Sequence, residues 1–473
     1  MKRLLLSLLA VLCITASSAQ EKKVKVACVG NSITYGAYIE DREHNSYPSQ
    51  LQRYLGDGFQ VRNFGVNGAT ALRRGDKPYV GLKAYEESKS FQPDIVLIKL
   101  GTNDTKPWNW KYKEEYMDDY QSLIDSYRQL DSHPRIILLT PVRCFLPEDG
   151  KTISPKRIET EVRPMVEALA FRNGLDIINM FNLFGDTWNQ AIMPDKLHPS
   201  AYGAGSMALK IYNHLMLREE GATSSSVVPF YKRGAETFNF HGFTGYNFLS
   251  DGVQCKVVEP KVVAEGKPWI WRARFWEHEP QTDIELLEHG YHLVYCDVAD
   301  LFGAPEAVKR WDMFYKHMRE AGFSKKVALE GLSRGGLIIY NWAARNPRKV
   351  ACIYADAPVM DFMQWPISTG SEKDVRNLLK AYGFSNVEEA AKWNGNPVDH
   401  ARVMAKARIP ILHVVGDADE AVLYEKNTKV FEQEMKRLGA PIKVIHKPAT
   451  GHHPHSLNNP QPIVDFILQA MNQ

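Results

Sequence analysis

The chain has 473 residues, which is enough for two or three domains. Hydrophobic residues make up 44% and charged residues 24%, an ordinary globular composition that can build large cores. The formal net charge of +3 is small for this length, so nothing in the composition points to nucleic acid or an anionic surface as a partner.

The first residues have the features of a signal peptide. Two basic residues, Lys2 and Arg3, precede an apolar run from Leu4 to Ile14 that is too short to span a bilayer. Small residues at Ser17–Ala19 then provide a cleavage site. Residues 1–19 are therefore predicted to be removed on export across the inner membrane, leaving a periplasmic protein with no membrane insertion.

Residues 20–220 alternate strand-like and helix-like segments. The strand-like runs are apolar throughout, which is typical of strands buried on both faces of a parallel sheet. Helices between them would cover both faces and give an α/β domain. The predicted strands are 24–29, 60–64, 94–98, 135–139 and 176–179, and the predicted helices are 46–55, 112–131 and 154–173.

Four polar clusters lie where the carboxyl ends of these strands are expected, and ligand chemistry in such sheets gathers there. A Ser, an Asp and a His provide a nucleophile, an orienting acid and a base. Backbone amides and an Asn side chain can donate hydrogen bonds to a developing oxyanion. The clusters are Ser32, Asn67–Gly68, Asn103–Asp104 and Asp195–Pro199.

These four blocks, in this order, resemble the SGNH (GDSL-type) hydrolases, and the resemblance covers almost all of residues 24–215. It implies a flavodoxin-like, three-layer sandwich. Asn31 stands where the best-known form of the family has Asp, which is closer to its carbohydrate esterases than to its lipases. The resemblance implies that Ser32 is the nucleophile, that Asp195 and His198 are the acid and base, and that Gly68 and Asn103 hold the oxyanion.

The short stretch 221–228 contains Gly and Ser and predicts a linker to a second domain at 229–473. Strand-like and helix-like runs alternate again in this second half. The predicted strands are 254–258, 268–276, 292–296, 350–354, 409–415 and 443–445, and the predicted helices are 305–321, 423–438 and 460–471.

A Gly-x-Ser-x-Gly-Gly motif at Gly331–Gly336 follows a buried strand-like run and precedes a helix-like run. That context predicts a nucleophile elbow, with Ser333 as the nucleophile. The turn should be so sharp that Gly331 and Gly335 tolerate no side chain. The amide of Arg334 is predicted to help hold an oxyanion.

The order Ser, Asp, His, each after a strand, is that of an α/β-hydrolase triad. Residues 250–473 resemble that superfamily, close to its prolyl-oligopeptidase-like and polysaccharide-esterase branches. The family's Gly-x-x-Asp-x-x-Val pattern favours Asp419 as the acid, with Asp417 as the alternative. Its Gly-His pattern favours His452 as the base, with His453 as the alternative.

Three other features of the second half remain open. The second oxyanion amide is expected near Phe275 or Trp276. In α/β-hydrolases the position of residues 359–405 carries a cap, where Trp365 and Trp393 either stack on sugar rings or pack in the core. The histidines after Gly451 could hold zinc, but no fourth ligand has suitable spacing, so neither a metal nor a cofactor is expected.

Together these features predict an exported esterase with two serine triads that acts on an esterified polysaccharide or its oligosaccharides. By resemblance, the first site would remove O-acetyl groups, and the second a methyl (uronate), acetyl or feruloyl ester. Two alternatives remain: one domain is a non-catalytic glycan-binding module, or the second domain is a serine peptidase. The oligomeric state is not indicated.

Overall fold

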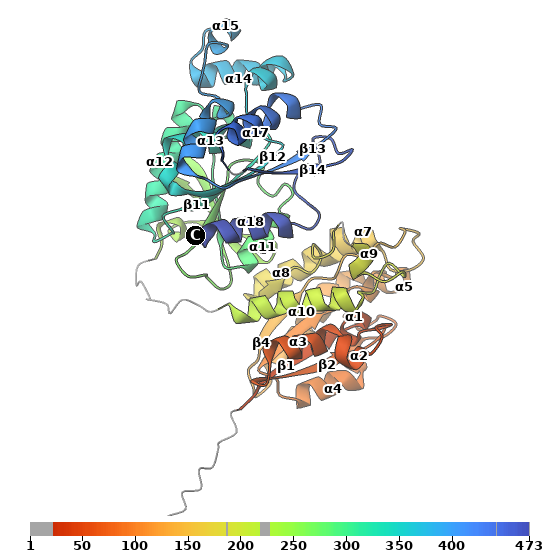
Figure 1. Ribbon diagram of the computed structural model, residues 1–473. Coiled ribbons are helices and arrows are strands. Elements are labelled where there is room, and N and C mark those ends of the chain that lie inside the picture. The colour runs from red at the N-terminus through yellow and green to blue at the C-terminus, as the bar shows by residue number, and fades with distance from the viewer. Residues whose placement is uncertain (1–21, 186–187, 218–227, 441, 473) are drawn as a thin grey trace, which may run out of the picture.

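The computed structural model describes residues 22–185, 188–217, 228–440 and 442–472, which form two α/β units packed against each other (Figure 1). The predicted signal peptide and nearly all of the predicted linker lie outside the described residues. Within the described ranges, the structure has no helix that is both long and apolar enough to cross a membrane.

The first unit is built on a parallel sheet. Its side chains alternate between two apolar clusters, because successive strand residues point to opposite faces. Cys28 and Leu97 belong to one cluster, and Val29 and Ile98 to the other. In spatial order the strands are β2 (Phe59–Gly65), β1 (Val24–Gly30), β3 (Ile95–Lys99), β4 (Arg135–Leu139) and β5 (Asp176–Ile178).

Helices cover both faces of this sheet and make a three-layer sandwich, as predicted. α3 (Tyr47–Leu55) and α10 (Ala201–Met216) pack on the face that carries Cys28. The other face is covered by α4 (Lys83–Ser90), α6 (Tyr116–Arg128) and α8 (Arg163–Asn173). Short helices in the connections are α1 (Ser32–Tyr35), α2 (Arg42–Asn45), α5 (Pro107–Trp110), α7 (Pro155–Arg157) and α9 (Trp188–Ala191).

The second unit is built on a mixed sheet of nine strands within the described part of the chain. The strands from β14 to β10 in spatial order pair in parallel, and the last three add an antiparallel extension. That order is β14 (Lys443–Lys447), β13 (Ile411–Gly416), β12 (Val350–Asp356), β11 (Val327–Leu332), β9 (Trp269–Arg272), β10 (His292–Cys296), β8 (Val253–Glu259), β7 (Phe243–Ser250) and β6 (Glu236–Phe240).

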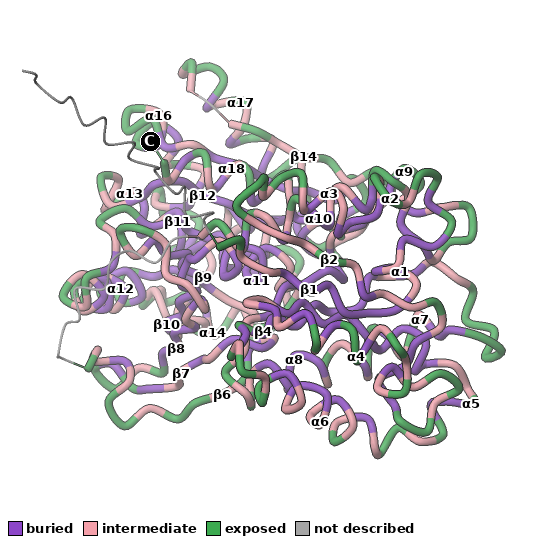
Figure 2. Tube along the Cα trace, turned by 90° about the horizontal axis from the view of Figure 1, so that it is seen from below, coloured by how far each residue is buried: buried purple, intermediate pink, exposed green. Residues whose placement is uncertain are grey.

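Helices also cover both faces of the second sheet, which confirms the predicted α/β class. One face packs on α12 (Pro305–Glu320), α13 (Gly335–Arg345), α16 (Ala401–Ala407) and α17 (Thr428–Arg437). The other packs on α11 (Gln281–Glu288) and α18 (Gln461–Met471). α14 (Glu372–Tyr382) and α15 (Val387–Ala390) lie in the predicted cap segment. Figure 2 shows buried residues running along the strands of both units.

The predicted strand 268–276 is too long, because β9 ends at Arg272. The Arg272 side chain is fully buried and forms ion pairs with Asp283 and Glu330. Its guanidinium also donates to the backbone carbonyls of Phe275 and His278, so the chain curls around this side chain instead of continuing as a strand.

The hairpin of β6 and β7 was not predicted. Its two strands are joined at His241 and Gly242, which both have positive φ, at 49° and 92°. Two residues of this conformation make the tight turn that matches the twist of the paired strands. A short aromatic run on either side of a turn-forming pair was the signal available in the sequence.

The five cysteines within the described residues are all buried and free. Cys255 of β8 and Cys296 of β10 stand directly opposite each other in the antiparallel ladder.

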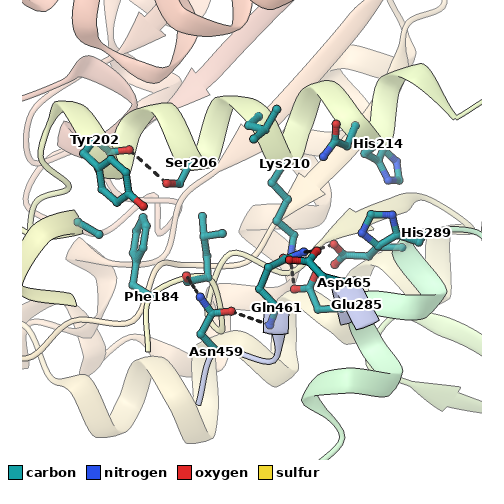
Figure 3. Close-up of a pocket in the computed structure, with 15 residues that line it drawn as sticks. Phe184, Tyr202, Ser206, Lys210, His214, Glu285, His289, Asn459, Gln461 and Asp465 are labelled. Atoms are coloured by element: carbon teal, nitrogen blue, oxygen red, sulfur yellow. Dashed lines mark hydrogen bonds and ion pairs between the residues drawn. The ribbon is translucent and has the colours of Figure 1, made fainter. Parts of the chain in front are cut away.

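The two units share one apolar cluster, which runs from Ala170 and Ile177 of the first unit to Phe240 and Phe243 of the hairpin. Beside it, Lys210 of α10 forms buried ion pairs with Glu285 and Glu288 of α11. A cavity of about 420 Å³ lies at this junction, lined by α10, α11 and α18 (Figure 3). None of the predicted catalytic residues lines it.

Candidate active sites

The first candidate site lies at the carboxyl end of β1, where Ser32 begins α1. The side chain of Asn31 caps this short helix by accepting the amide of Ile33 at 3.1 Å. Asn31, the position that departs from the best-known SGNH pattern, is therefore fully buried and shapes the turn that presents Ser32.

Asp195 and His198 meet Ser32 from the loop before α10. Ser32 Oγ lies 2.9 Å from His198 Nε2, and His198 Nδ1 lies 2.6 Å from Asp195 Oδ2. The other carboxylate oxygen of Asp195 accepts the amides of Leu197 and His198, both at 3.0 Å. Burial raises the pKa of Asp195, but hydrogen bonds from the amide and ring of His198 outweigh it, so the pKa falls below its usual value. The carboxylate is therefore charged and holds the ring with Nε2 facing the serine.

The two predicted oxyanion donors lie beside each other. Gly68 has a φ of 80°, a left-handed conformation that favours glycine. The buried side-chain amide of Asn103 donates to the carbonyl of the next residue, Ala69, at 3.1 Å. The loop that carries Gly68 is tied to the end of β1, because the Val66 amide donates to the Gly30 carbonyl at 3.0 Å.

Tyr38 is a neighbour of this site that was not predicted from the sequence. Its ring meets the ring of His198 edge-on, with centroids 5.1 Å apart, yet 79% of the residue is exposed. An exposed aromatic ring beside this histidine offers a flat apolar surface at the edge of the candidate site.

The second candidate site lies at the carboxyl end of β11. Ser333 has a φ of 50°, in the strained left-handed region, between β11 and α13. A non-glycine residue holds this conformation only where its surroundings impose it, and such residues cluster at functional sites. This is the strand–turn–helix geometry expected of a nucleophile elbow.

The glycines around Ser333 differ from the expectation. A Cβ on Gly331 would lie 2.6 Å from the Ile339 side chain and 2.9 Å from the Gly335 backbone, which leaves no room for it. A Cβ on Gly335 would meet Ala273 and Arg274 at 3.5 Å, an ordinary contact. The expectation that Gly335 tolerates no side chain is therefore wrong. The second crowded position is Gly336, where a Cβ would lie 2.8 Å from the backbone of the segment after β12.

His452 connects Ser333 to Asp419. Its Nε2 lies 3.0 Å from Ser333 Oγ, and its Nδ1 lies 2.7 Å from Asp419 Oδ2. The other oxygen of Asp419 accepts the amides of Ala421 and Val422, both at 2.9 Å. Burial raises the pKa of Asp419, but the hydrogen bond from His452 and those amides outweigh it and lower the pKa.

The two alternative residues lie elsewhere. Asp417 accepts a hydrogen bond from His446 at 2.6 Å, and both side chains are 42% exposed. His453 packs against His452 and His455, with burial and the neighbouring His455 lowering its pKa. Among the described residues, neither Asp417 nor His453 forms a hydrogen bond with Ser333 or His452.

The loop after β9 passes the start of α13. The Ala273 amide donates to the carbonyl of Glu330, and the Arg274 nitrogen lies 3.9 Å from where a Cβ on Gly335 would be. The backbone amide of Arg274 is therefore a candidate for the second oxyanion donor, and it comes earlier in the chain than the predicted Phe275 or Trp276. The ring of Trp276 packs instead on the hairpin and β10.

The side chain of Arg334 lies among aromatic rings at the mouth of the second site. Its guanidinium is 5.9 Å from the Phe275 ring, 5.5 Å from Phe302 and 5.8 Å from Trp365. Trp365 therefore lies beside the site. Trp393, by contrast, packs on Tyr382 and Phe384 within the cap segment.

Comparison with protein families divides the chain in the same way. Residues 28–205 match the GDSL-like lipase/acylhydrolase family, and residues 310–473 match the prolyl oligopeptidase family. The chain is 38% identical over 206 residues to a protein of Xylanibacter ruminicola described as an acetylxylan esterase. The match covers 40% of this chain and 42% of that protein, so it spans less than half of the relative's length.

Solved structures resemble parts of the chain. Est1E from Butyrivibrio proteoclasticus is 20% identical with a TM-score of 0.36, over 48% of this chain and 99% of that one. The dipeptidyl peptidase 4 of Porphyromonas gingivalis is 12% identical with a TM-score of 0.38, over 50% of this chain and 35% of that one.

Proposed function

We propose that this chain, which joins a GDSL-like lipase/acylhydrolase domain to a domain of the prolyl oligopeptidase family, is an exported carbohydrate esterase with two independent serine active sites. The observation that carries the proposal is the pair of complete Ser–His–Asp triads. In each triad, the serine oxygen lies within hydrogen-bond distance of Nε2 of the histidine, and a carboxylate oxygen of the Asp lies within hydrogen-bond distance of Nδ1.

Each triad would work by the same two steps. The histidine takes the proton of the serine hydroxyl as the oxygen attacks the ester carbonyl, and then gives it to the departing alcohol. Water, activated by the same histidine, hydrolyses the acyl-enzyme. Each Asp, charged and bonded to Nδ1, keeps Nε2 directed at the serine and stabilises the imidazolium that forms.

For the Ser32 site we propose the removal of O-acetyl groups from a polysaccharide or its oligosaccharides. Support comes from the acetylxylan esterase that the chain resembles and from the oxyanion donors Gly68 and Asn103. The exposed ring of Tyr38 beside His198 would hold a sugar ring close to the nucleophile.

For the Ser333 site we propose a different ester of the same polysaccharide, such as a uronate methyl ester, as in pectin, an acetyl group or a feruloyl group. The arginine and aromatic rings at its mouth suit a planar or ring-shaped ligand that also offers hydrogen-bond acceptors. Arg334 would contribute its backbone amide to the oxyanion and its side chain to this surface.

A second candidate for the Ser333 domain is a peptidase, because its family match is to prolyl oligopeptidases. Hydrolysis of a proline-containing chromogenic peptide by the parent protein, lost in Ser333→Ala, would select this candidate. Hydrolysis of methyl, acetyl or feruloyl esters, lost in the same variant, selects the esterase.

The deciding experiment is intact-mass measurement after treatment with a fluorophosphonate, which labels activated serines. We expect two adducts on the parent protein, one on Ser32→Ala, one on Ser333→Ala and none on the double variant. A single adduct on the parent would mean that one domain is a non-catalytic module. No adduct would contradict both sites.

A further inference from the structure

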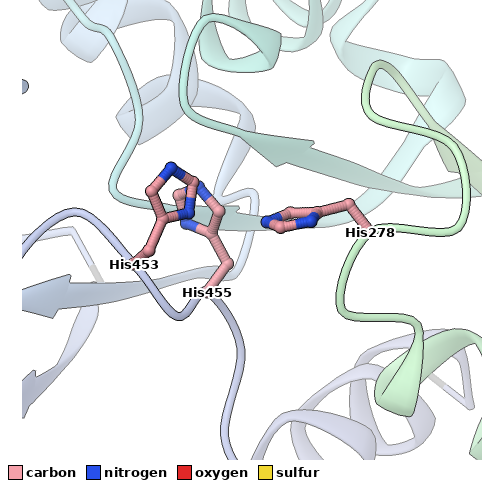
Figure 4. Close-up of side chains that lie close together, drawn as sticks. All are labelled: His278, His453 and His455. Atoms are coloured by element: carbon pink, nitrogen blue, oxygen red, sulfur yellow. The ribbon is translucent and has the colours of Figure 1, made fainter. Parts of the chain in front are cut away.

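Three histidines converge beside the Ser333 triad. His453 and His455 come from the loop after β14, whereas His278 comes from the loop after β9, far earlier in the chain (Figure 4). One ring nitrogen from each of the three lies within 4.8 Å of the other two. No zinc site was expected from the sequence, because no fourth ligand had suitable spacing. The fold assigns His452 to the triad and brings His278 to the cluster in its place.

The cluster is held from two sides. His455 is buried, and its Nδ1 lies 2.7 Å from the buried carboxylate of Asp356, which leaves Nε2 for another partner. A carboxylate on the far nitrogen of an imidazole is the usual support for a metal-binding histidine. The backbone of His278 is held too, because its carbonyl accepts a hydrogen bond from the buried guanidinium of Arg272. The side chains of His278 and His453 are exposed and free to adjust.

The ring spacing matches a metal site. Ring centroids are 5.4 Å apart for His278 and His453, 5.7 Å for His278 and His455, and 4.8 Å for His453 and His455. Three imidazoles bound to a tetrahedral Zn²⁺ with nitrogens at about 2.0 Å have ring centres about 5 Å apart. Ligand sets made only of imidazole suit Zn²⁺, Cu²⁺ or Ni²⁺ rather than Mg²⁺ or Ca²⁺.

We propose that His278, His453 and His455 bind one Zn²⁺, with water completing its coordination. The ring of His452 lies 5.0 Å from that of His453 and 4.9 Å from that of His455. The proposed zinc site therefore adjoins the histidine of the proposed Ser333 triad.

Binding is measured by titrating the full chain with zinc chloride in a calorimeter, so this test does not depend on either proposed activity. The test variant is His278→Ala with His453→Ala, both exposed positions, while buried His455 is left in place. The control is His317→Ala, which removes a half-buried histidine of α12 that pairs with Asp251. The parent and the control are expected to bind one more Zn²⁺ than the double variant. Equal stoichiometry and affinity in all three proteins would overturn the site.

Discussion

Exchanging Asp419 for Asn, and making the same exchange at Asp417, tests which of the two carboxylates is the acid of the proposed Ser333 triad. Asp419 lies 2.7 Å from His452 Nδ1, whereas Asp417 bonds His446. An Asn at 419 keeps the shape of the side chain. It removes the charge and offers an NH₂ group as readily as an oxygen to the ring. The imidazole can then present a protonated Nε2 to Ser333, a tautomer that cannot accept the serine proton.

The two substitutions should have very different effects on turnover. Loss of the triad acid lowers turnover by about 10⁴, equivalent to about 5.5 kcal/mol of transition-state stabilisation. The Asp417–His446 pair has both side chains 42% exposed, so its loss should cost about 1 kcal/mol of folding stability or less. Turnover per folded molecule should then stay near that of the parent.

Both variants are best made in a Ser32→Ala background, so that only the Ser333 site contributes to ester hydrolysis. Turnover at saturating substrate and the melting temperature are measured for each. We expect Asp419→Asn to be folded and nearly inactive, and Asp417→Asn to be active. The reverse pattern would transfer the role of the acid to Asp417, and two active variants would leave this triad without an acid.

Three further outcomes are expected. Asn103→Ala should lower acetate release by about 10²–10³ and spare the Ser333 activity, and unchanged release would contradict its role as an oxyanion donor. Gly331→Ala should lower the free energy of unfolding in urea by about 1–3 kcal/mol, because its Cβ has no room. Gly335→Ala should change that free energy by less than about 1 kcal/mol, and equal losses in the two variants would contradict the difference in crowding between these positions. Burial lowers the pKa of His413 to about 3 in the folded protein, compared with about 6.5 in the unfolded chain. As the pH drops below about 6.5, the unfolded chain binds a proton that the folded protein does not, so the stability of the fold decreases. Between pH 7 and pH 5, His413→Gln should lose about 2 kcal/mol less stability than the parent. Urea midpoints measured at the two pH values check this, and the same difference between midpoints in both proteins would contradict it.

The fold class was predictable because the information is local. Runs such as 94–98 and 135–139 are apolar throughout, which predicts strands covered on both faces without knowledge of their neighbours. The end of β9 was not predictable in this way. Arg272 stops the strand through Asp283 and Glu330, and both of these partners come later in the chain.

For the candidate sites, too, local motifs were predictable and contacts between distant parts of the chain were not. Ser32 and Ser333 could be proposed from short motifs, because each motif carries its own turn chemistry. The choice between Asp417 and Asp419 depends on which carboxylate reaches a loop from another strand, and the family pattern indicated it only indirectly. His278 carries no local signal, because its partners lie in a loop that only the folded sheet brings near.

The shared apolar cluster and the buried Lys210 ion pairs have a consequence for proteolysis. A protease that cuts between residues 217 and 228 would break the covalent connection, but the halves would remain associated through Ala170, Ile177 and the hairpin that carries Phe240. A nicked sample should therefore elute from a sizing column at its original volume and separate into two fragments only in denaturant. The two proposed nucleophiles, Ser32 and Ser333, would therefore stay in one particle even after the peptide between their domains is cut.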